Sequence, residues 1–243
     1  HDHALGKTRI NVIAGPAGYV PVNDAANAAE TVLTALGLHD PTGLSCYNNL
    51  APFAPTPGDC RDRFVALQDR AFNNDGSINY PNGLGQPPIP PIQPGNINNA
   101  AGGTVTPAFN PSITPQWVPE YFGDMAVVNG VIRPKVTAYP GVYRLRLLEG
   151  SNARCYTLGL AAGKTAVPFY VIADEQGYLD SPQMANVLTM CPGERYEALV
   201  DFRGMLPNTV VVMTNTAGAP FPAGITPQQN KSPFAAMAQL MTF

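Results

Sequence analysis

Residues 142–148, VYRLRLL, decide the fold of this chain, because apolar and charged side chains alternate along them. Tyr143, Leu145 and Leu147 share one face and the two arginines take the other, which is the period of a β-strand. Eight further short apolar runs predict strands as well: 64–68, 125–129, 155–160, 168–173, 186–190, 195–202, 209–214 and 236–243. Strands of this length, mostly spaced by about 8–12 residues, predict an all-β Greek-key sandwich or small barrel.

The composition supports this fold class and excludes two classes of partner. The chain has 243 residues, including 26 prolines and 23 glycines, as expected for an all-β protein with long Pro- and Gly-rich loops. Charged residues make up 13% of the chain, the formal net charge is −3, and no basic stripe occurs, so a nucleic-acid partner is not expected. No apolar run reaches the roughly 18 residues of a membrane span, so no membrane partner is expected.

The first part of the chain is less regular. Residues 10–22 predict a strand, a glycine turn and a second strand. Residues 24–38 predict the single short helix, with Asp24 as N-cap, Val32, Leu33 and Leu36 on one face, and Gly37 at the end. Two long loops are expected, at 39–62 and at 81–116, the second with nine prolines.

The four cysteines indicate an oxidising compartment, because an even count in a weakly charged, Pro-rich chain is typical of disulfides. Cys46 and Cys60 bracket a loop and are expected to pair. Cys155 and Cys191 lie at the edges of predicted strands and could pair across them. Four buried thiols are the alternative. Disulfides would favour a secreted, extracellular or periplasmic protein.

The candidate metal ligands are His1 and His3. On an extended chain, residues i and i+2 point to the same side, with Cα atoms about 6–7 Å apart, so two imidazoles can hold one metal or two adjacent metals. Imidazole favours copper, zinc, iron or nickel over magnesium or calcium. A free terminal amine could also chelate Cu(II) together with these rings, or His1 could brace a copper as in polysaccharide monooxygenases. His39 is interpreted as a solvated loop histidine.

Six segments, in order along the chain, resemble motifs of three-domain multicopper oxidases. The branch is the one that includes spore-coat laccase, bilirubin oxidase and phenoxazinone synthase. The segments are 1–12 (HDHALGKTRINV), 67–70 (LQDR), 75–81 (DGSINYP), 117–130 (WVPEYFGDMAVVNG), 143–154 (YRLRLLEGSNAR) and 191–202 (CPGERYEALVDF). The segment 143–154 departs from the family pattern at Glu149, a position where Asn is usual.

The resemblance implies a cupredoxin-like fold and three parts along the chain. Residues 1–23 would be the last strands of the first cupredoxin domain, with the His-x-His motif. Residues 24–63 would be a linker or insertion with the short helix and a disulfide loop. Residues 64–243 would be the whole second domain, which has no copper site of its own.

The resemblance also implies a function. His1 and His3 would each bind one of the paired, type 3 coppers of a trinuclear cluster, and the remaining ligands would lie outside this chain. The complete enzyme would oxidise a phenol-like compound, a pigment or a metal ion one electron at a time and reduce O₂ to water with four electrons. Neighbouring cupredoxin domains or chains would supply the other histidines, and the isolated chain would be inactive. The protein could belong to a spore or cell surface.

No catalytic residue beyond these ligands is expected in the chain. The charged residues of the motifs, Asp69, Arg70, Glu194, Arg195 and Asp201, are interpreted as paired scaffold residues. The alternative function is a non-catalytic cupredoxin-like structural or binding module in which the N-terminal histidines bind copper incidentally.

Overall fold

The all-β prediction is confirmed in the computed structural model, which describes residues 1–22, 24, 26–38, 61–79 and 120–243. The described strands are β1 (Asp62–Arg70), β2 (Met125–Val128), β3 (Val131–Ile132), β4 (Val142–Glu149), β5 (Tyr156–Ala162), β6 (Thr165–Val167), β7 (Phe169–Asp174), β8 (Gly177–Ala185), β9 (Val187–Met190), β10 (Arg195–Asp201), β11 (Val211–Asn215) and β12 (Gln239–Thr242). Two short helices, α1 (Thr8–Ala14) and α2 (Ala28–Ala35), precede them, and one 3₁₀ turn, η2 (Ala235–Ala238), leads into β12.

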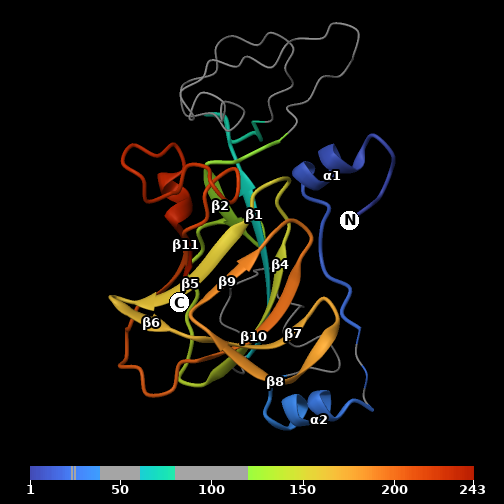
Figure 1. Cartoon of the computed structure of the whole chain (residues 1–243), viewed down its shortest axis with the longest axis vertical. Coiled ribbons are helices and arrows are strands. Elements are labelled where there is room, and N and C mark those ends of the chain that lie inside the picture. The colour runs from blue at the N-terminus through green and yellow to red at the C-terminus, as the bar shows by residue number, and fades with distance from the viewer. Residues whose placement is uncertain (23, 25, 39–60, 80–119) are drawn as a thin grey trace, which may run out of the picture.

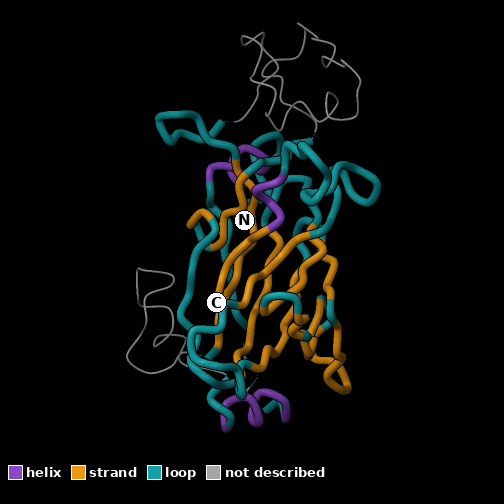
Figure 2. Tube along the Cα trace, turned by 90° about the vertical axis from the view of Figure 1, so that its left-hand side faces the viewer, coloured by secondary structure: helices purple, strands orange, loops and turns teal. Residues whose placement is uncertain are grey.

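The strands form two facing layers (Figures 1 and 2). One sheet has the order β3-β2-β1-β4-β10-β7-β8, and the other has the order β12-β11-β5-β6 with β9 also paired to β5. Within the first sheet β1 and β4 run parallel, while the other named pairs are antiparallel. Consecutive strands β4 and β5 lie in different sheets, so the chain crosses between the layers repeatedly and closes one core.

Strand β4 has the two faces that its sequence predicts. Tyr143, Leu145 and Leu147 are at most 2% exposed and point into the core between the sheets, where they meet residues of β5 such as Leu158 and Leu160. Burying such side chains contributes about 1.5–3 kcal/mol each, so this alternation is sufficient to fix the strand's register.

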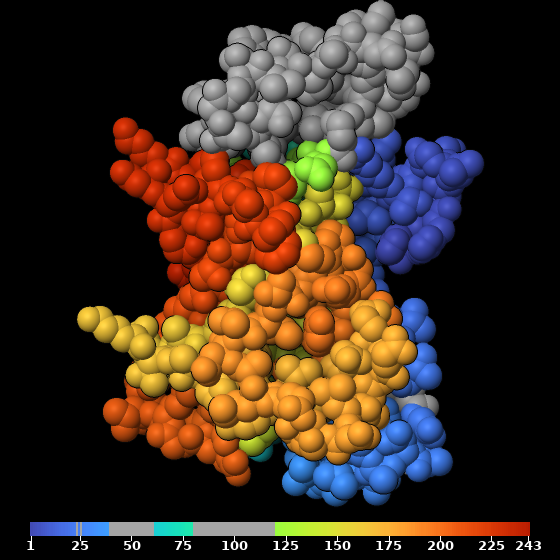
Figure 3. All heavy atoms as spheres, viewed as in Figure 1, coloured from blue at the N-terminus to red at the C-terminus, as the bar shows by residue number. Residues whose placement is uncertain are grey.

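The other face of β4 is charged but is also buried. Arg144 and Arg146 are 0% and 7% exposed. Arg146 donates to both oxygens of Asp62, at 2.9 and 2.8 Å, and Arg144 pairs with Glu197 of β10. Burial of these arginines follows from the N-terminal segment, which passes along this side of the molecule, shown in blue in Figure 3. Tyr19 of that segment contacts the ring of Phe64, which lies beneath Arg146.

Helix α2 also lies against this outer side, at the opposite end of the sheets from α1 (Figure 1). Its N-cap is Asn27, not Asp24, and the side chain of Asn27 accepts from the amide of Ala29. Leu33 is buried in a small cluster with Leu38 and Ile172, whereas Val32 and Leu36 stay exposed. Its buried Glu30 accepts a hydrogen bond from Tyr178 of β8 at 3.1 Å.

Cys155 and Cys191 form a disulfide, as the pairing of strand edges predicts. It joins the residue before β5 to the turn between β9 and β10. The predicted Cys46–Cys60 pair, His39, the loop at 81–116 and the 117–119 portion of one motif lie outside the described residues.

Besides the N-cap of α2 and the short strands β3 and β6, which were not predicted, three features differ from the sequence predictions. Residues 10–22 do not form two strands: helix α1 ends at Ala14, and the rest has no regular structure. A strand needs a neighbour for its backbone groups, and none is paired here within the described chain, whereas a helix satisfies them locally. The described part holds two short α-helices rather than one.

The third error is β8, a nine-residue strand that was not predicted. It lies at the edge of the seven-stranded sheet and is largely exposed. Its sequence, GYLDSPQMA, contains a proline and lacks apolar alternation. Both features are tolerated at an edge, where one side of the strand needs no partner and neither face need be buried.

Candidate metal centre

The two predicted ligands, His1 and His3, lie next to each other. Their ring centroids are 4.8 Å apart, and the planes are nearly parallel, at 16°. Both residues are exposed. Two neighbouring imidazoles are donors of the kind that copper, zinc, iron and nickel prefer.

Asp2, between them, fixes this arrangement. Its Oδ1 accepts from the amide of Ala4 at 2.9 Å and from the hydroxyl of Thr8 at 3.2 Å, and its Oδ2 accepts from the side-chain amide of Asn11 at 2.9 Å. The Ala4 amide first, and then the Asn11 side chain, lower the pKa of Asp2. The carboxylate therefore ties the histidine pair, His1 and His3, to helix α1.

Helix α1 is in turn held at the end of β1, in the seven-stranded sheet. Ile13, the buried residue of α1, contacts Ala71 and Tyr121 in a small apolar cluster. Arg70, at the end of β1, donates from Nη2 to the carbonyl of Val12 at 2.9 Å. These roles of Asp2 and Arg70 were not predicted. An acidic residue shortly before a helix is a recognisable signal, but the partner of a buried arginine is not evident from sequence.

The histidine pair fits a metal of the imidazole-binding class but gives only two donors. Among the residues that the structure describes, no group of three or more His, Cys, Asp or Glu side chains could hold a metal ion. Further ligands would therefore have to come from outside the described part. Asp2, the carboxylate between the two rings, is occupied by three hydrogen bonds, which disfavours its use by oxygen-preferring cations.

A second group of polar side chains lies inside the molecule. We call Asp69, Glu149, Ser151, Arg154 and Tyr156 the buried polar cluster; each is at most 5% exposed. Asp69 accepts from Nε of Arg154 at 2.9 Å and from the amide of Gly123 at 2.6 Å. Nη2 of Arg154 donates to the carbonyl of Gly123 at 2.7 Å.

The cluster is closely packed on all sides. The guanidinium of Arg154 lies 5.6 Å from the ring centroid of Phe122 and 4.5 Å from that of Phe234. Burial raises the pKa of Glu149 to about 8, although hydrogen bonds from Ser151 partly oppose that change. Desolvation also raises the pKa of Tyr156. Its side chains are buried among the described residues, and we assign the cluster to the scaffold, the role expected for Asp69.

The remaining motif residues also have structural partners. Glu194 accepts from the amide of Cys191 at 2.7 Å, Arg195 pairs with Glu175, and Asp201 pairs with Arg203. These contacts agree with the scaffold role expected from the sequence.

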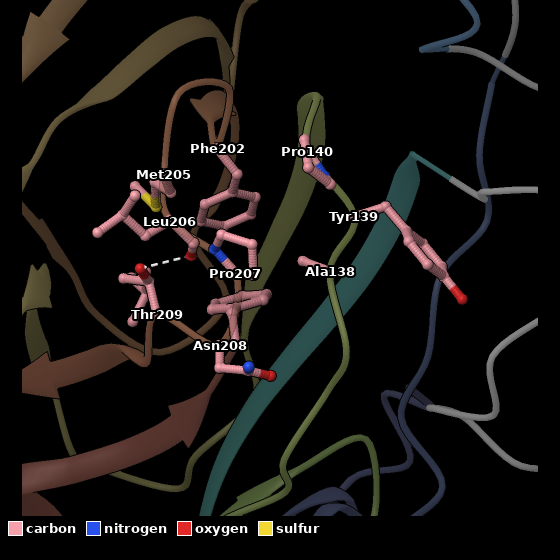
Figure 4. A pocket seen from close by; sticks show the side chains of 11 residues that line it. Ala138, Tyr139, Pro140, Phe202, Met205, Leu206, Pro207, Asn208 and Thr209 are labelled. Carbon is pink, nitrogen blue, oxygen red and sulfur yellow. Dashed lines mark hydrogen bonds between the residues drawn. The ribbon is translucent and has the colours of Figure 1, made fainter.

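A hollow lies between the segment that precedes β4 and the loop that joins β10 to β11 (Figure 4). Phe202, Met205, Leu206 and Phe243 contribute to its lining. The Thr209 hydroxyl donates to the carbonyl of Leu206. The lining contains no histidine, cysteine or carboxylate side chain.

Known proteins resemble this chain along most of its length. No family model matches the chain. The chain is 32% identical over 225 residues to "Multicopper oxidase LPR1" of Arabidopsis thaliana, which covers 92% of this chain and 30% of that protein. It is 30% identical over 218 residues to a laccase of Bacillus subtilis, covering 90% of this chain and 33% of the laccase.

Solved structures show the same relationship. The crystal structure of a variant of the multicopper oxidase McoA from Aquifex aeolicus matches with a TM-score of 0.64 and 25% identity. The match covers 100% of this chain and 39% of that one. No helix in the described part of the chain is long and apolar enough to cross a membrane. The chain thus spans about a third of the length of its curated relatives, and by sequence and fold it belongs to the multicopper oxidases, a family of oxidoreductases.

Proposed function

We propose that this chain is the part of a multicopper oxidase that supplies two copper ligands, His1 and His3, and the middle scaffold domain. The observation that carries this proposal is the arrangement of the histidine pair: two exposed, parallel imidazoles 4.8 Å apart, oriented by Asp2. Bound copper would accept electrons singly from a reducing substrate and pass four of them to O₂. In the family these two ligands belong to the paired, type 3 coppers, and we assign His1 and His3 to one copper each.

The chain's own residues contribute position rather than chemistry. Asp2 holds the ligand segment against α1, and α1 is fixed on β1. The exposed Val20 and Val22, at 89% and 84%, follow in an irregular segment whose Tyr19 is packed inward. We infer that a neighbouring cupredoxin domain covers these valines and carries the other ligands. Residues 1–23 would then complete that neighbouring domain, and residues 64–243 would form the middle domain. Residues 24–63 would link the two.

We further propose an extracytoplasmic location, secreted or periplasmic. The Cys155–Cys191 disulfide supports it, because such bonds persist in oxidising compartments. The reducing substrate is proposed only as a class: a phenol, a pigment or a metal ion.

The test uses the complete oxidase that contains this chain. His1→Ala and His3→Ala are compared with His39→Ala, the third histidine of the chain, as the matched control. We expect each ligand variant to lose bound copper, measured by elemental mass spectrometry. O₂ consumption with a phenol should fall by more than the roughly 100-fold typical of losing an outer partner of a metal site.

The alternative is a non-catalytic module with incidental copper binding. It predicts that copper binds this chain alone, is lost when the terminal amine is blocked, and supports no O₂ consumption in the complete protein. Full copper content and full O₂ consumption in both His1→Ala and His3→Ala would exclude our proposal.

A further inference from the structure

Arg70 is a buried cation whose side chain is committed to backbone carbonyls. It is 4% exposed and lies at the end of β1. Nη1 donates to the carbonyl of Asp69 at 2.8 Å, and Nη2 donates to the carbonyl of Val12 at 2.9 Å. Arg146 and Arg154 form salt bridges with Asp62 and Asp69, whereas Arg70 forms none with a carboxylate of the described residues. The buried charge of Arg70 therefore interacts with a backbone carbonyl of the N-terminal segment.

The carbonyl that Arg70 contacts lies in the last turn of α1. The final carbonyls of a helix have few partners within it, and a cation there is favourable. The Val12 carbonyl also accepts from the amide of Gly15 at 3.2 Å. The helix contains no basic residue in its own last turn. Arg70, more than fifty residues later in the chain, supplies that charge from the scaffold.

Ile13 is the buried side chain of α1. Ile13 is 4% exposed and contacts Ala71 and Tyr121. Tyr121 is fully buried, and its hydroxyl accepts from the amide of Ala71 at 2.6 Å. The helix has seven residues and no side-chain cap at its start, so it depends on these tertiary contacts.

The opposite end of α1 carries the candidate ligands. Thr8 and Asn11 donate to the carboxylate of Asp2, and Asp2 lies between the two histidines. A continuous series of contacts thus leads from Arg70 through Val12 and α1 to Asp2. The rings of the histidine pair stack on each other, and this series of contacts connects them to β1.

We infer that Arg70 is a positioning residue: by fixing α1 to β1 it sets where the histidine pair is presented to copper. This inference rests on the proposed function. It predicts that loss of Arg70 moves the ligands without removing them. Misplacement by about 1 Å can lower a rate about 100-fold even when the altered residue is remote from the chemistry.

The experiment compares Arg70→Met, Arg70→Lys and the exposed Arg203→Met as control. Amide hydrogen exchange is measured on each protein, and copper content and O₂ consumption are measured in the complete oxidase. In Arg70→Met we expect α1 amides to exchange at least about tenfold faster while β4 and β10 stay protected. O₂ consumption per bound copper should fall by about 10- to 100-fold.

Arg70→Lys keeps the charge and one donor toward Val12 and should restore part of both effects. Arg203→Met should match the parent protein. Unchanged α1 exchange, or unchanged O₂ consumption per copper, in Arg70→Met overturns the inference. If Arg70→Met fails to fold, Arg70→Lys decides alone, because full parent values in that variant also overturn it.

The two proposals can fail separately. If His1→Ala and His3→Ala leave copper and O₂ consumption intact, the proposed function fails while the exchange data still report the Arg70 contact. If those variants abolish O₂ consumption and Arg70→Met does not change it, only the positioning role fails.

Discussion

The buried polar cluster and the histidine pair place polar side chains in opposite environments. The Asp69–Arg154 ion pair of the cluster is 0% exposed on both sides, whereas His1 and His3 are exposed. Inside the protein, each charge needs a partner because desolvation is costly, so such groups are held rigidly and serve the fold. On the surface, two imidazoles cost the fold little and remain available to a ligand. Burial with an ion-pair partner is therefore typical of a scaffold group, whereas exposed imidazoles remain accessible to a ligand.

The largest effect is expected from breaking the buried pair. Asp69→Asn leaves the guanidinium of Arg154 buried without its counter-ion. The free energy of unfolding should fall by about 3–5 kcal/mol. Asp201→Asn breaks an exposed pair and should cost less than about 1 kcal/mol. Urea unfolding of the two variants measures both; equal losses would contradict the distinction between the two environments.

Gly123 tests how tightly the cluster is enclosed. A Cβ at Gly123 would lie 2.4 Å from the backbone nitrogen of Arg70, so the backbone would have to move. Gly123→Ala should therefore destabilise the protein by about 2–3 kcal/mol. Gly18→Ala is the control, because a Cβ there meets nothing within 4 Å. If Gly123→Ala leaves the thermal unfolding of the protein unchanged, the buried polar cluster is not tightly enclosed.

Glu149 makes stability depend on pH. Its pKa is raised to about 8 in the folded protein, so between the unfolded value and about 8 the folded state holds more protons than the unfolded state. Stability should therefore be greatest at low pH in this range and be lost as the pH rises, by about 1–2 kcal/mol between about pH 6 and pH 8.

Glu149→Gln removes this titration and should flatten the dependence of unfolding free energy on pH. The exposed Glu120→Gln provides the control. A slope that Glu149→Gln leaves unchanged, measured by denaturant unfolding at several pH values, would mean that another group is responsible.

The smallest effect on stability is expected at the candidate site. The double variant His1→Ala, His3→Ala removes only exposed rings, so the free energy of unfolding should change by less than about 0.5 kcal/mol. The same variant should abolish copper retention in the complete oxidase. A large loss of stability without copper would show that the pair is structural, and the comparison above would then no longer hold.

Much of this arrangement could be predicted from the sequence where one physical effect dominates. The alternation in residues 142–148 gives β4 and its inward face, because only one register buries three large apolar side chains. The burial of Arg144 and Arg146 was not predictable from that stretch. It depends on Asp62, Glu197 and the passing N-terminal segment, which are distant in sequence.

The candidate site shows the same division. The spacing of His1 and His3 predicts their proximity, since it is a local property. Helix α1 was mistaken for a strand because its apolar residues, in INVIA, suit either structure. The contact from Arg70 to Val12 joins residues 58 positions apart, and no local pattern indicates it.

The parallel pairing of β1 with β4 has a consequence for how the protein is made. β1 ends at Arg70, but its neighbour β4 begins only at Val142, and β10, which flanks β4 on the other side, ends at Asp201. At a synthesis rate of about 5–20 residues per second, β1 waits seconds for its partners, as non-local sheets generally do. During that interval β1, whose Arg70 contacts α1, is not yet part of a complete sheet. Ordered placement of His1 and His3 is therefore expected to be a late event in biosynthesis, after the sheet is complete.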